Sequence, residues 1–389
     1  MGCTHGCEAS HNASSAFHQK YKLGNKIGKG GFAQVRIARN VKSNEQVAVK
    51  ILNMKAEMAS VEMRFLKMCQ NQHCVRLLEA HIEKDLSYLV MELCDATLFA
   101  TFDKMKVLTE HAVVPFVIGM LKSLIHIHSM GIVHRDVKPE NFLCVGPQCI
   151  VKLCDFGVAA SVSHHDDESL YGVSGTAAFV SPEMVSGKKY GAKTDVWSLG
   201  VLMYALFFGH LPYESKNGTS AGLKQAIRSG SSPPSFSLPL QLRQSGAVSV
   251  SQQAQDFVRA LLVREAKWRL TAVAAIDSPY LGKASPGKNP GAPSLRPMLH
   301  AVLRTDAIKA VEETSFETEF VDRRLRNLQA AQFSSFDSSR PTTASSTSAV
   351  STTAPVSSKR TSSVGSRGLG ESSSPRSANT NSYEHFRAA

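Results

Sequence analysis

The stretch Val133–Asn141 reads V-H-R-D-V-K-P-E-N, and the rest of the chain can be interpreted outward from it. It brings a carboxylate (Asp136), an ammonium group (Lys138) and an amide (Asn141) into one short segment. A site that moves an anionic group needs this mixture, because positioning and charge stabilisation dominate such chemistry. A second carboxylate follows 19 residues after Asp136, in the tripeptide D-F-G at Asp155–Gly157. A lone D-F-G is common, but at this distance after H-R-D chance is a poor explanation.

A glycine-rich segment lies upstream, where Ile27–Val35 reads I-G-K-G-G-F-A-Q-V. Glycine lets a backbone approach a phosphate closely because it has no Cβ to clash. Alone, the segment fits an ordinary glycine hairpin or a dinucleotide-binding turn about as well, since Ala33 replaces the third glycine. The string V-A-V-K at Val47–Lys50 favours the phosphate-binding interpretation of this segment. Its lysine follows Gly28 by 22 residues on a predicted strand and offers a compact charge for phosphates.

Together these strings resemble the glycine-rich loop, strand lysine, catalytic loop and D-F-G segment of eukaryotic protein kinases. Three more segments resemble the family in the expected order: Ser181–Glu183 (S-P-E), Asp195–Gly200 (D-V-W-S-L-G) and Glu265–Ala272 (E-A-K-W-R-L-T-A). The resemblance covers residues 21–280. It implies an α+β bilobal protein kinase fold, with a β-rich N-lobe that carries one key helix and a mainly helical C-lobe.

The resemblance assigns catalytic roles to four residues. Asp136 would align the acceptor hydroxyl and take its proton, and Lys138 would neutralise the transferring phosphoryl group. Lys50 would hold the α- and β-phosphates of ATP. Its acidic partner would be Glu62, which lies in the helical pattern Met58–Met68, only 12 residues after Lys50.

The resemblance also implies Mg²⁺ and ATP as cofactors. Mg²⁺ would be bound by Asn141 and Asp155, because this ion takes few protein carboxylates and completes its shell with phosphates and water. The expected ATP contacts are Ile27, Gly28, Gly30, Gly31, Val35, Ala48, Lys50, Met91, Glu92, Cys94 and Leu143. The hinge exit Cys94–Phe99 (C-D-A-T-L-F) lacks the G-G-E of the calcium-dependent group, so Asp95 is the acidic residue available there.

Lys138, and Thr176 in G-T-A-A-F-V-S-P-E, resemble the serine/threonine branch of the family. The strings M-E-L-C, H-R-D-V-K-P-E-N-F-L and R-L-T-A are most similar to the calcium/calmodulin-regulated and calcium-dependent group. The expected reaction is transfer of the γ-phosphate of Mg-ATP to serine or threonine hydroxyls of protein substrates. Val158, directly after D-F-G, predicts a preference for threonine.

Two other functions compete with this one. A catalytically inactive scaffold of the same fold is the main alternative, although inactive members of the family typically lose at least one of Lys50, Asp136, Asn141 and Asp155, which are all present. A dinucleotide-binding enzyme would explain the glycine-rich segment. It would leave H-R-D and D-F-G unexplained.

The formal charge of +12 allows attraction to anionic lipid, phosphates or acidic partners, or simply a well-solvated surface. No nucleic-acid partner is expected. Eight scattered cysteines favour a reducing, cytoplasmic location over a disulfide framework. The start M-G-C-T-H-G-C predicts myristoylation of Gly2 and palmitoylation of Cys3 and Cys7, with attachment to the cytoplasmic face of a membrane. An unmodified leader is the alternative.

Composition divides the chain into five parts. Residues 1–20 are predicted to be a flexible leader, 21–280 the catalytic domain, and 281–297 a linker rich in Gly, Pro and Ser. Residues 298–333 are predicted to form an amphipathic docking or regulatory helix. Its basic and apolar residues around 320–328 resemble a weak calmodulin target, while packing on the C-lobe is the alternative. The Ser/Thr-rich tail 334–389 is predicted to be disordered.

Overall fold

The computed structural model describes residues 16–29, 33–52, 56–83, 86–164, 166–282 and 293–305. All of them belong to one compact unit. Some expectations lie outside these residues: Gly30 and Gly31 of the glycine-rich segment, the acylation sites Gly2, Cys3 and Cys7, the segment 306–333 and the tail 334–389.

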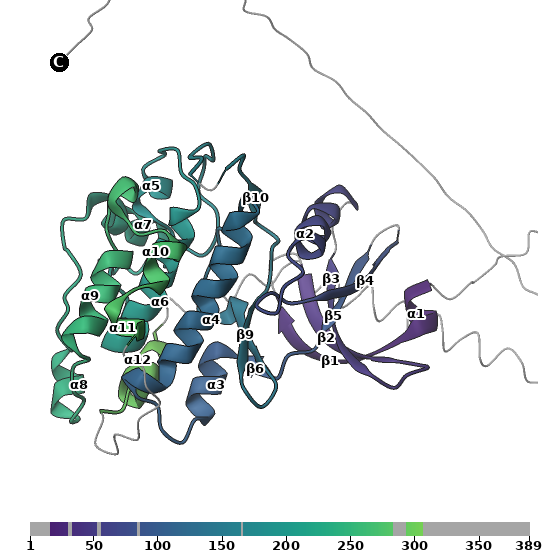
Figure 1. Cartoon of the computed structure of the whole chain (residues 1–389), viewed down its shortest axis with the longest axis horizontal. Helices are drawn as coiled ribbons and strands as arrows, with labels where there is room; N and C mark the ends of the chain where they lie inside the picture. Colours follow the sequence, from purple (N-terminus) through teal and green to yellow (C-terminus); the bar gives the residue numbers. More distant parts are fainter. Residues whose placement is uncertain are drawn as a thin grey trace, which may run out of the picture. The chain divides into compact units, whose positions relative to one another are not determined.

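The N-lobe is built on an antiparallel sheet of five described strands in the order β1-β2-β3-β5-β4, with helix α2 packed against it (Figure 1). The elements are β1 (Tyr21–Lys29), β2 (Ala33–Asn40), β3 (Gln46–Leu52), α2 (Ala56–Met68), β4 (Leu77–Ile82) and β5 (Ser87–Glu92).

Strand β3 shows how the sequence produces this sheet. Successive side chains of a strand point to opposite faces. Val47, Val49 and Ile51 therefore enter a buried cluster with Tyr88 on one face. Lys50 lies on the opposite face of the same strand, so the alternation alone positions its ammonium group away from the apolar cluster.

Helix α1 (Ala16–Lys20) corrects the prediction of a flexible leader over residues 1–20. Phe17 is fully buried, and its ring stacks on Tyr88 with centroids 4.0 Å apart. The Lys20 ammonium pairs with the Glu79 carboxylate. A single turn of helix is marginal in water, so this packing is what holds it. Composition could not show that one phenylalanine among small polar residues is an anchor.

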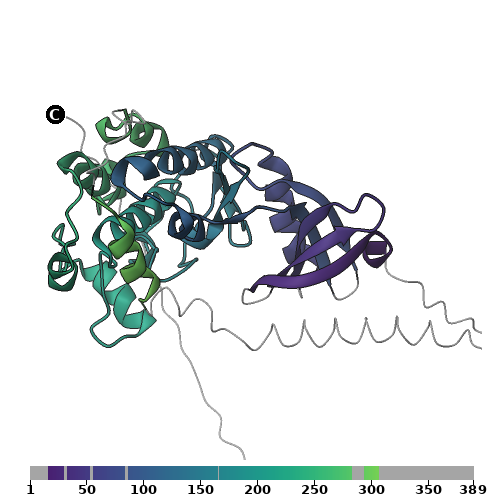
Figure 2. The same ribbon diagram turned by 90° about the horizontal axis from the view of Figure 1, so that it is seen from below.

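The C-lobe is mainly helical, as expected (Figures 1 and 2). Its helices are α3 (Leu98–Lys104), α4 (Glu110–Ser129), α5 (Pro182–Val185), α6 (Lys193–Phe208), α7 (Ser220–Ser229), α8 (Leu240–Gln244), α9 (Gln252–Leu261), α10 (Ala272–Ile276), α11 (Pro279–Gly282) and α12 (Arg296–Leu303), with 3₁₀ turns at Pro139–Asn141 and Ala266–Trp268. Five short strands form a three-stranded sheet in the order β6-β8-β9 and a two-stranded sheet of β7 and β10: β6 (Ala96–Thr97), β7 (Ile132–Val133), β8 (Phe142–Val145), β9 (Ile150–Leu153) and β10 (Ala160–Ser161).

Helix α6 forms the centre of this lobe. Every residue from Thr194 to Phe208 is buried, as expected for a helix that is apolar on all sides. The helix ends at Gly209, whose φ of +74° is left-handed, and a Cβ there would lie 2.6 Å from Leu242 Cδ1. Among the described helices, α4 alone is long and apolar enough to cross a bilayer, and most of it is buried inside the fold.

Helix α12 corrects the predicted boundaries at the C-terminal side. The backbone N–H of Leu295 donates to the Leu108 carbonyl at 2.7 Å, so this part of the predicted linker 281–297 belongs to the fold. Met298, Leu299 and Val302 are buried, and α12 lies beside α3 and α6 (Figure 1). Residues 298–303, the start of the predicted docking helix, are therefore packed on the C-lobe.

Candidate active site

Lys50 joins segments from both lobes. Its ammonium nitrogen lies 2.7 Å from Glu62 Oε1 on α2 and 2.7 Å from Asp155 Oδ1, which follows β9. Strand β3 fixes the backbone of Lys50 between β2 and β5, opposite Val35 and Leu89. The short connection from Lys50 to Glu62 is thus compatible with a closed ion pair.

Burial and charge oppose each other in this triad. Burial alone would lower the pKa of Lys50, but the Asp155 and Glu62 carboxylates outweigh it and hold that pKa above its usual range. Burial would raise the pKa of Asp155, but the Lys50 ammonium holds it well below its usual range. Glu62 is almost fully buried, and burial keeps its pKa above its ordinary value despite Lys50. Lys50 and Asp155 are therefore both ionised at neutral pH.

Asp136 is held in the catalytic loop by Thr176. Its Oδ1 accepts hydrogen bonds from the Thr176 backbone N–H at 2.8 Å and from the Thr176 hydroxyl at 2.7 Å. Lys138 Nζ donates to the same hydroxyl at 2.9 Å and lies 2.9 Å from Asp136 Oδ2. The hydroxyl of Thr176 thus fixes the carboxylate and the ammonium group together.

Asn141 and Asp155 present oxygen atoms that suit Mg²⁺. The amide nitrogen of Asn141 donates to the Asp136 carbonyl at 2.7 Å, which leaves its amide oxygen for a cation. The Asp155 side chain is 44% exposed although its Oδ1 binds Lys50. One amide oxygen and one carboxylate form a hard, incomplete ligand set, as expected for an ion that also binds phosphates and water. The residues therefore fit Mg²⁺.

The apolar residues expected around adenine lie on facing elements. Ala48 and Met91 are partners across β3 and β5, and both are buried. Val35 on β2 and Leu143 on β8 are half-buried, while Ile27 at the end of β1 is exposed. Gly28 lies opposite Val35 in the sheet. A Cβ added at Gly28 would lie 3.6 Å from Val35 Cβ, which is an ordinary van der Waals contact.

The two expected hinge residues can serve adenine only through their backbone. The Glu92 carboxylate pairs with Lys152 at 2.9 Å and accepts the Arg76 backbone N–H at 2.7 Å. The backbone N–H of Glu92 donates to the Arg76 carbonyl at 3.0 Å. Burial raises the pKa of the Cys94 thiol to about 12, so this side chain is not a nucleophile.

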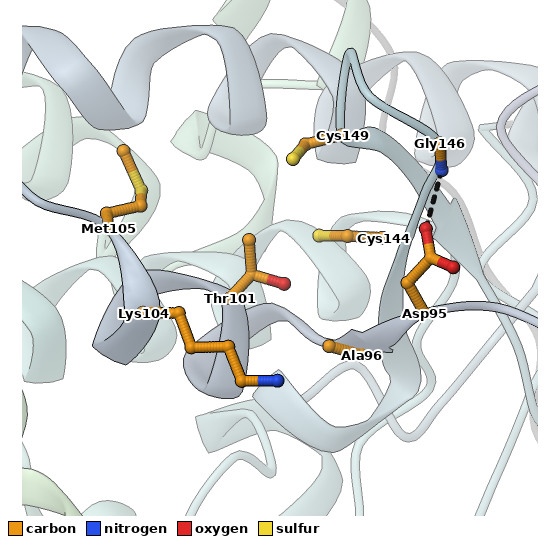
Figure 3. Close-up of a pocket in the computed structure, with 8 residues that line it drawn as sticks. All are labelled: Asp95, Ala96, Thr101, Lys104, Met105, Cys144, Gly146 and Cys149. Carbon is orange, nitrogen blue, oxygen red and sulfur yellow. Dashed lines mark hydrogen bonds between the residues drawn. The ribbon is translucent and has the colours of Figure 1, made fainter.

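Asp95, the acidic residue at the hinge exit, binds a backbone group of the C-lobe. Its carboxylate accepts the Gly146 backbone N–H at 2.7 Å, at the turn between β8 and β9 (Figure 3). It lines a cavity of about 310 Å³ that includes the sulfur atoms of Met105, Cys144 and Cys149 (Figure 3). The carboxylate therefore stabilises a turn.

Asp195 is a functional residue whose role the sequence did not reveal. Its buried carboxylate accepts the backbone N–H groups of His134 at 2.9 Å and Arg135 at 2.8 Å, and it pairs with His128 Nε2 at 2.8 Å. Burial would raise the pKa of Asp195, but His128 and these N–H groups hold it below its ordinary value. The signals were the family-like segment that begins at Asp195 and the long uncharged run that follows it.

Two residues of the site adopt left-handed backbone. Arg135 has φ of +66° and Asp155 has φ of +64°, a conformation that side chains with a Cβ rarely adopt. The buried Phe156 packs edge-on against His134 with ring centroids 5.2 Å apart, which keeps D-F-G turned inward. The Arg135 side chain donates to the Val158 carbonyl at 2.6 Å.

This combination of motifs and geometry agrees with a comparison against known families, in which the protein kinase domain matches residues 21–281. The chain belongs to the protein kinase family. The expected family and its bilobal α+β fold are thereby confirmed.

Curated kinases give the same result. CDPK-related kinase 5 of Arabidopsis thaliana is 30% identical over 320 residues, 78% of this chain and 51% of that kinase. Serine/threonine-protein kinase PEPKR2 of the same plant is 33% identical over 263 residues, 67% of this chain and 53% of that kinase. Calcium/calmodulin-dependent protein kinase type 1 of Macrobrachium nipponense is 32% identical over 286 residues, which is 70% of this chain and 79% of that kinase. The chain spans about half the length of the first two kinases.

Proposed function

We propose that this chain is an active protein serine/threonine kinase that transfers the γ-phosphate of Mg-ATP to hydroxyl groups of protein substrates. The observation that carries the proposal is the closed Lys50–Glu62 and Lys50–Asp155 pairing. In the same structure Thr176 joins Asp136 to Lys138. A phosphoryl-transfer site needs positioned charges more than covalent chemistry, and these charges are already positioned.

Each residue has a separate task in the proposed reaction. Lys50 would hold the α- and β-phosphates, and Asn141 and Asp155 would bind the Mg²⁺ that neutralises charge on the phosphates. Asp136 would orient the acceptor hydroxyl and take its proton. The hydroxyl oxygen then forms a bond to Pγ while the bond from Pγ to the ADP oxygen breaks. Lys138 would stabilise the negative charge of the transferring group.

The test is phosphate transfer to a mixed protein substrate by the wild type and by Asp155→Asn. Loss of one metal-binding carboxylate should lower the rate on the order of a thousandfold. The matched control is Asp256→Asn on the exposed face of α9, which should keep full activity. A wild type that binds Mg-ATP but transfers nothing, even after treatment with upstream kinases and calcium-calmodulin, would support the inactive scaffold instead.

We also propose that threonine is the preferred acceptor. Val158 is partly exposed directly after D-F-G, and the bond from Arg135 to its carbonyl fixes its backbone. In the family to which this chain belongs, a β-branched residue at this position tends to favour threonine as the acceptor. Paired peptides that differ only in Ser or Thr at the acceptor position test this. Faster phosphorylation of the serine peptides would refute it, and Val158→Leu should shift the ratio toward serine.

We further propose a cytoplasmic kinase attached to a membrane through acylated Gly2, Cys3 and Cys7. One myristoyl chain binds membranes only marginally, with a constant of about 10⁴ M⁻¹, so the nearby cysteines would supply the second anchor. Mass spectrometry of the chain from eukaryotic cells tests the modification. Gly2→Ala should abolish both the acylation and membrane fractionation, and an unmodified Gly2 would remove the proposal.

We also propose calmodulin as a regulator. One of the similar proteins is named as a calcium/calmodulin-dependent kinase. In this chain Met298, Leu299 and Val302 are buried against the C-lobe, so they are not available to an external partner. A calmodulin contact would therefore use residues beyond 305. Calcium-dependent retention of the full chain on calmodulin tests it, and retention that is independent of calcium would argue against it.

A further inference from the structure

The first part of the N-lobe carries an unusually one-sided charge. Among its described side chains outside the active site, residues 16–49 include six cations and the single carboxylate Glu45. Five of the six cations are here called the basic edge: Lys22, Lys26, Arg36, Arg39 and Lys42. Lys20 is excluded because it pairs with Glu79. Four of the five are exposed, and Arg36 is partly exposed.

The basic edge runs along β1, one of the two outer strands of the described sheet, and the neighbouring β2. Lys22 lies opposite Arg39, and Lys26 lies opposite Arg36. Residues opposite each other share a face of the sheet, and like charges placed this way destabilise the pair. Arg36 and Arg39 are an odd number of residues apart in β2, so the two pairs lie on opposite faces. Positive charge therefore lies on both faces of the sheet at this edge.

Helix α1, at the start of the described residues, lies beside this same edge. The Val41 backbone N–H donates to the Lys20 carbonyl at 2.9 Å, so α1 ends beside the turn between β2 and β3 (Figure 1). That turn presents Lys42 and the apolar Val41, which is 62% exposed. An extended chain spans at most about 3.5 Å per residue, so the nine residues from Cys7 to Ala16 reach at most about 30 Å. Only surfaces near α1 are within that reach.

We propose that the basic edge is a docking surface for an anionic lipid bilayer, with Val41 inserting at its rim. This deepens the proposed membrane attachment, because it states which face of the kinase meets the membrane. Cations near an anionic surface strengthen binding about fivefold each and act only within a Debye length of about 8 to 10 Å. Charged residues on an outer strand can also serve to prevent pairing with the strands of another molecule. That role would not explain Lys42 and the exposed Val41, which lie in a turn and not on the outer strand.

The experiment uses the full-length chain produced without acylation, so that its outcome is separate from the acylation proposal. Partition is measured onto phosphatidylcholine vesicles with and without phosphatidylserine, at low and at physiological ionic strength. The test variant is Lys22→Gln/Lys26→Gln/Lys42→Gln. Arg39 is kept because its guanidinium donates to Asn44 and braces the turn. The control variant Lys106→Gln/Lys216→Gln/Arg243→Gln removes the same charge from exposed positions of the C-lobe.

The proposal expects binding that needs phosphatidylserine and weakens with salt, and that falls on the order of a hundredfold in the test variant but little in the control. Both variants should phosphorylate a soluble peptide like the wild type. Equal losses of vesicle binding in the two variants would show that binding depends only on the net charge of the protein, and this would overturn the proposal. Absence of wild-type binding at low salt would overturn it too. Tighter, edge-dependent binding to an oligonucleotide than to vesicles would assign the surface to nucleic acid instead.

Discussion

At the residue scale, Thr176 decides how Asp136 is oriented. Its hydroxyl donates to the carboxylate and accepts from Lys138, so a single oxygen atom couples the two groups. Hydrogen bonds to charged groups contribute about 1.5–3 kcal/mol each, and this one acts where the acceptor hydroxyl would bind.

We therefore expect Thr176→Val to lower kcat by about ten- to a hundredfold while the KM for ATP changes little. In the proposed reaction Lys50 would hold the ATP phosphates, and the hydrogen bonds of the Thr176 hydroxyl go to Asp136 and Lys138. Thr176→Ser keeps the hydroxyl and should retain most of the activity. Steady-state kinetics with one peptide substrate measures both parameters. Full activity of Thr176→Val would show that the hydroxyl does not matter, and a loss in Thr176→Ser as large as that in Thr176→Val would show that the methyl group is needed as well.

Much of the site could be predicted at this scale because its residues lie in short strings. Lys50, Asp136 and Asp155 stand in distinctive local patterns, and the structure brings Lys50 and Asp155 together over 105 positions of sequence. Their catalytic roles remain predictions. The contacts of Thr176 and Asp195 could not be predicted, because they depend on how separate segments fold back onto the catalytic loop.

At the element scale, the docking of α1 should depend on pH. His18 is partly buried beside the Tyr88 ring, and burial lowers its pKa below the usual value of about 6.5. Protonation therefore favours the undocked helix. The docking should be fully stable above about pH 6.5 and weaken as the pH falls toward the lowered pKa of the docked state.

Hydrogen exchange of residues 16–21, corrected for the intrinsic pH dependence, measures this effect. Exchange should speed up in the wild type below about pH 6.5 and much less in His18→Gln, which cannot take up a proton. An identical pH response in the two proteins would assign the change to another group.

Helix α12 should behave as part of the C-lobe core. Leu299 is fully buried, so Leu299→Ala should cost about 2–5 kcal/mol of unfolding free energy. Leu303 is 38% exposed on the same helix, and Leu303→Ala should cost less than about 1 kcal/mol. Urea denaturation of the two variants gives the comparison. Similar small losses would mean that α12 is only loosely attached.

Element boundaries were the weakest part of the sequence prediction for a physical reason. Helices α1 and α12 are short, and their own propensities are too small to reveal them. Their stability comes from Phe17 and Leu299 packing into cores built by distant segments. The long α6 was expected as a core helix because its apolar residues continue over the whole element.

At the scale of the whole molecule, the site connects the two lobes through Lys50 and Asp155. A ligand that binds only the folded chain stabilises it, by about 2.7 kcal/mol at a hundred times its dissociation constant. Mg-ATP should therefore raise the melting temperature by at least about 5 °C. Asp155→Asn should lose the part of this shift that requires Mg²⁺, and Asp256→Asn should keep it. A shift of equal size with EDTA present would mean that the metal contributes nothing to binding.

The left-handed backbone at Arg135 and Asp155 sets stability against activity in this chain. Such a conformation costs roughly 1–2 kcal/mol per residue for any side chain other than glycine. Glycine at either position would thus make the protein more robust while removing a side chain that the proposed reaction needs. If a lineage of this protein stopped catalysing, mutation would be free to recover that stability. Descendants that had become scaffolds would be expected to show glycine at these two positions first.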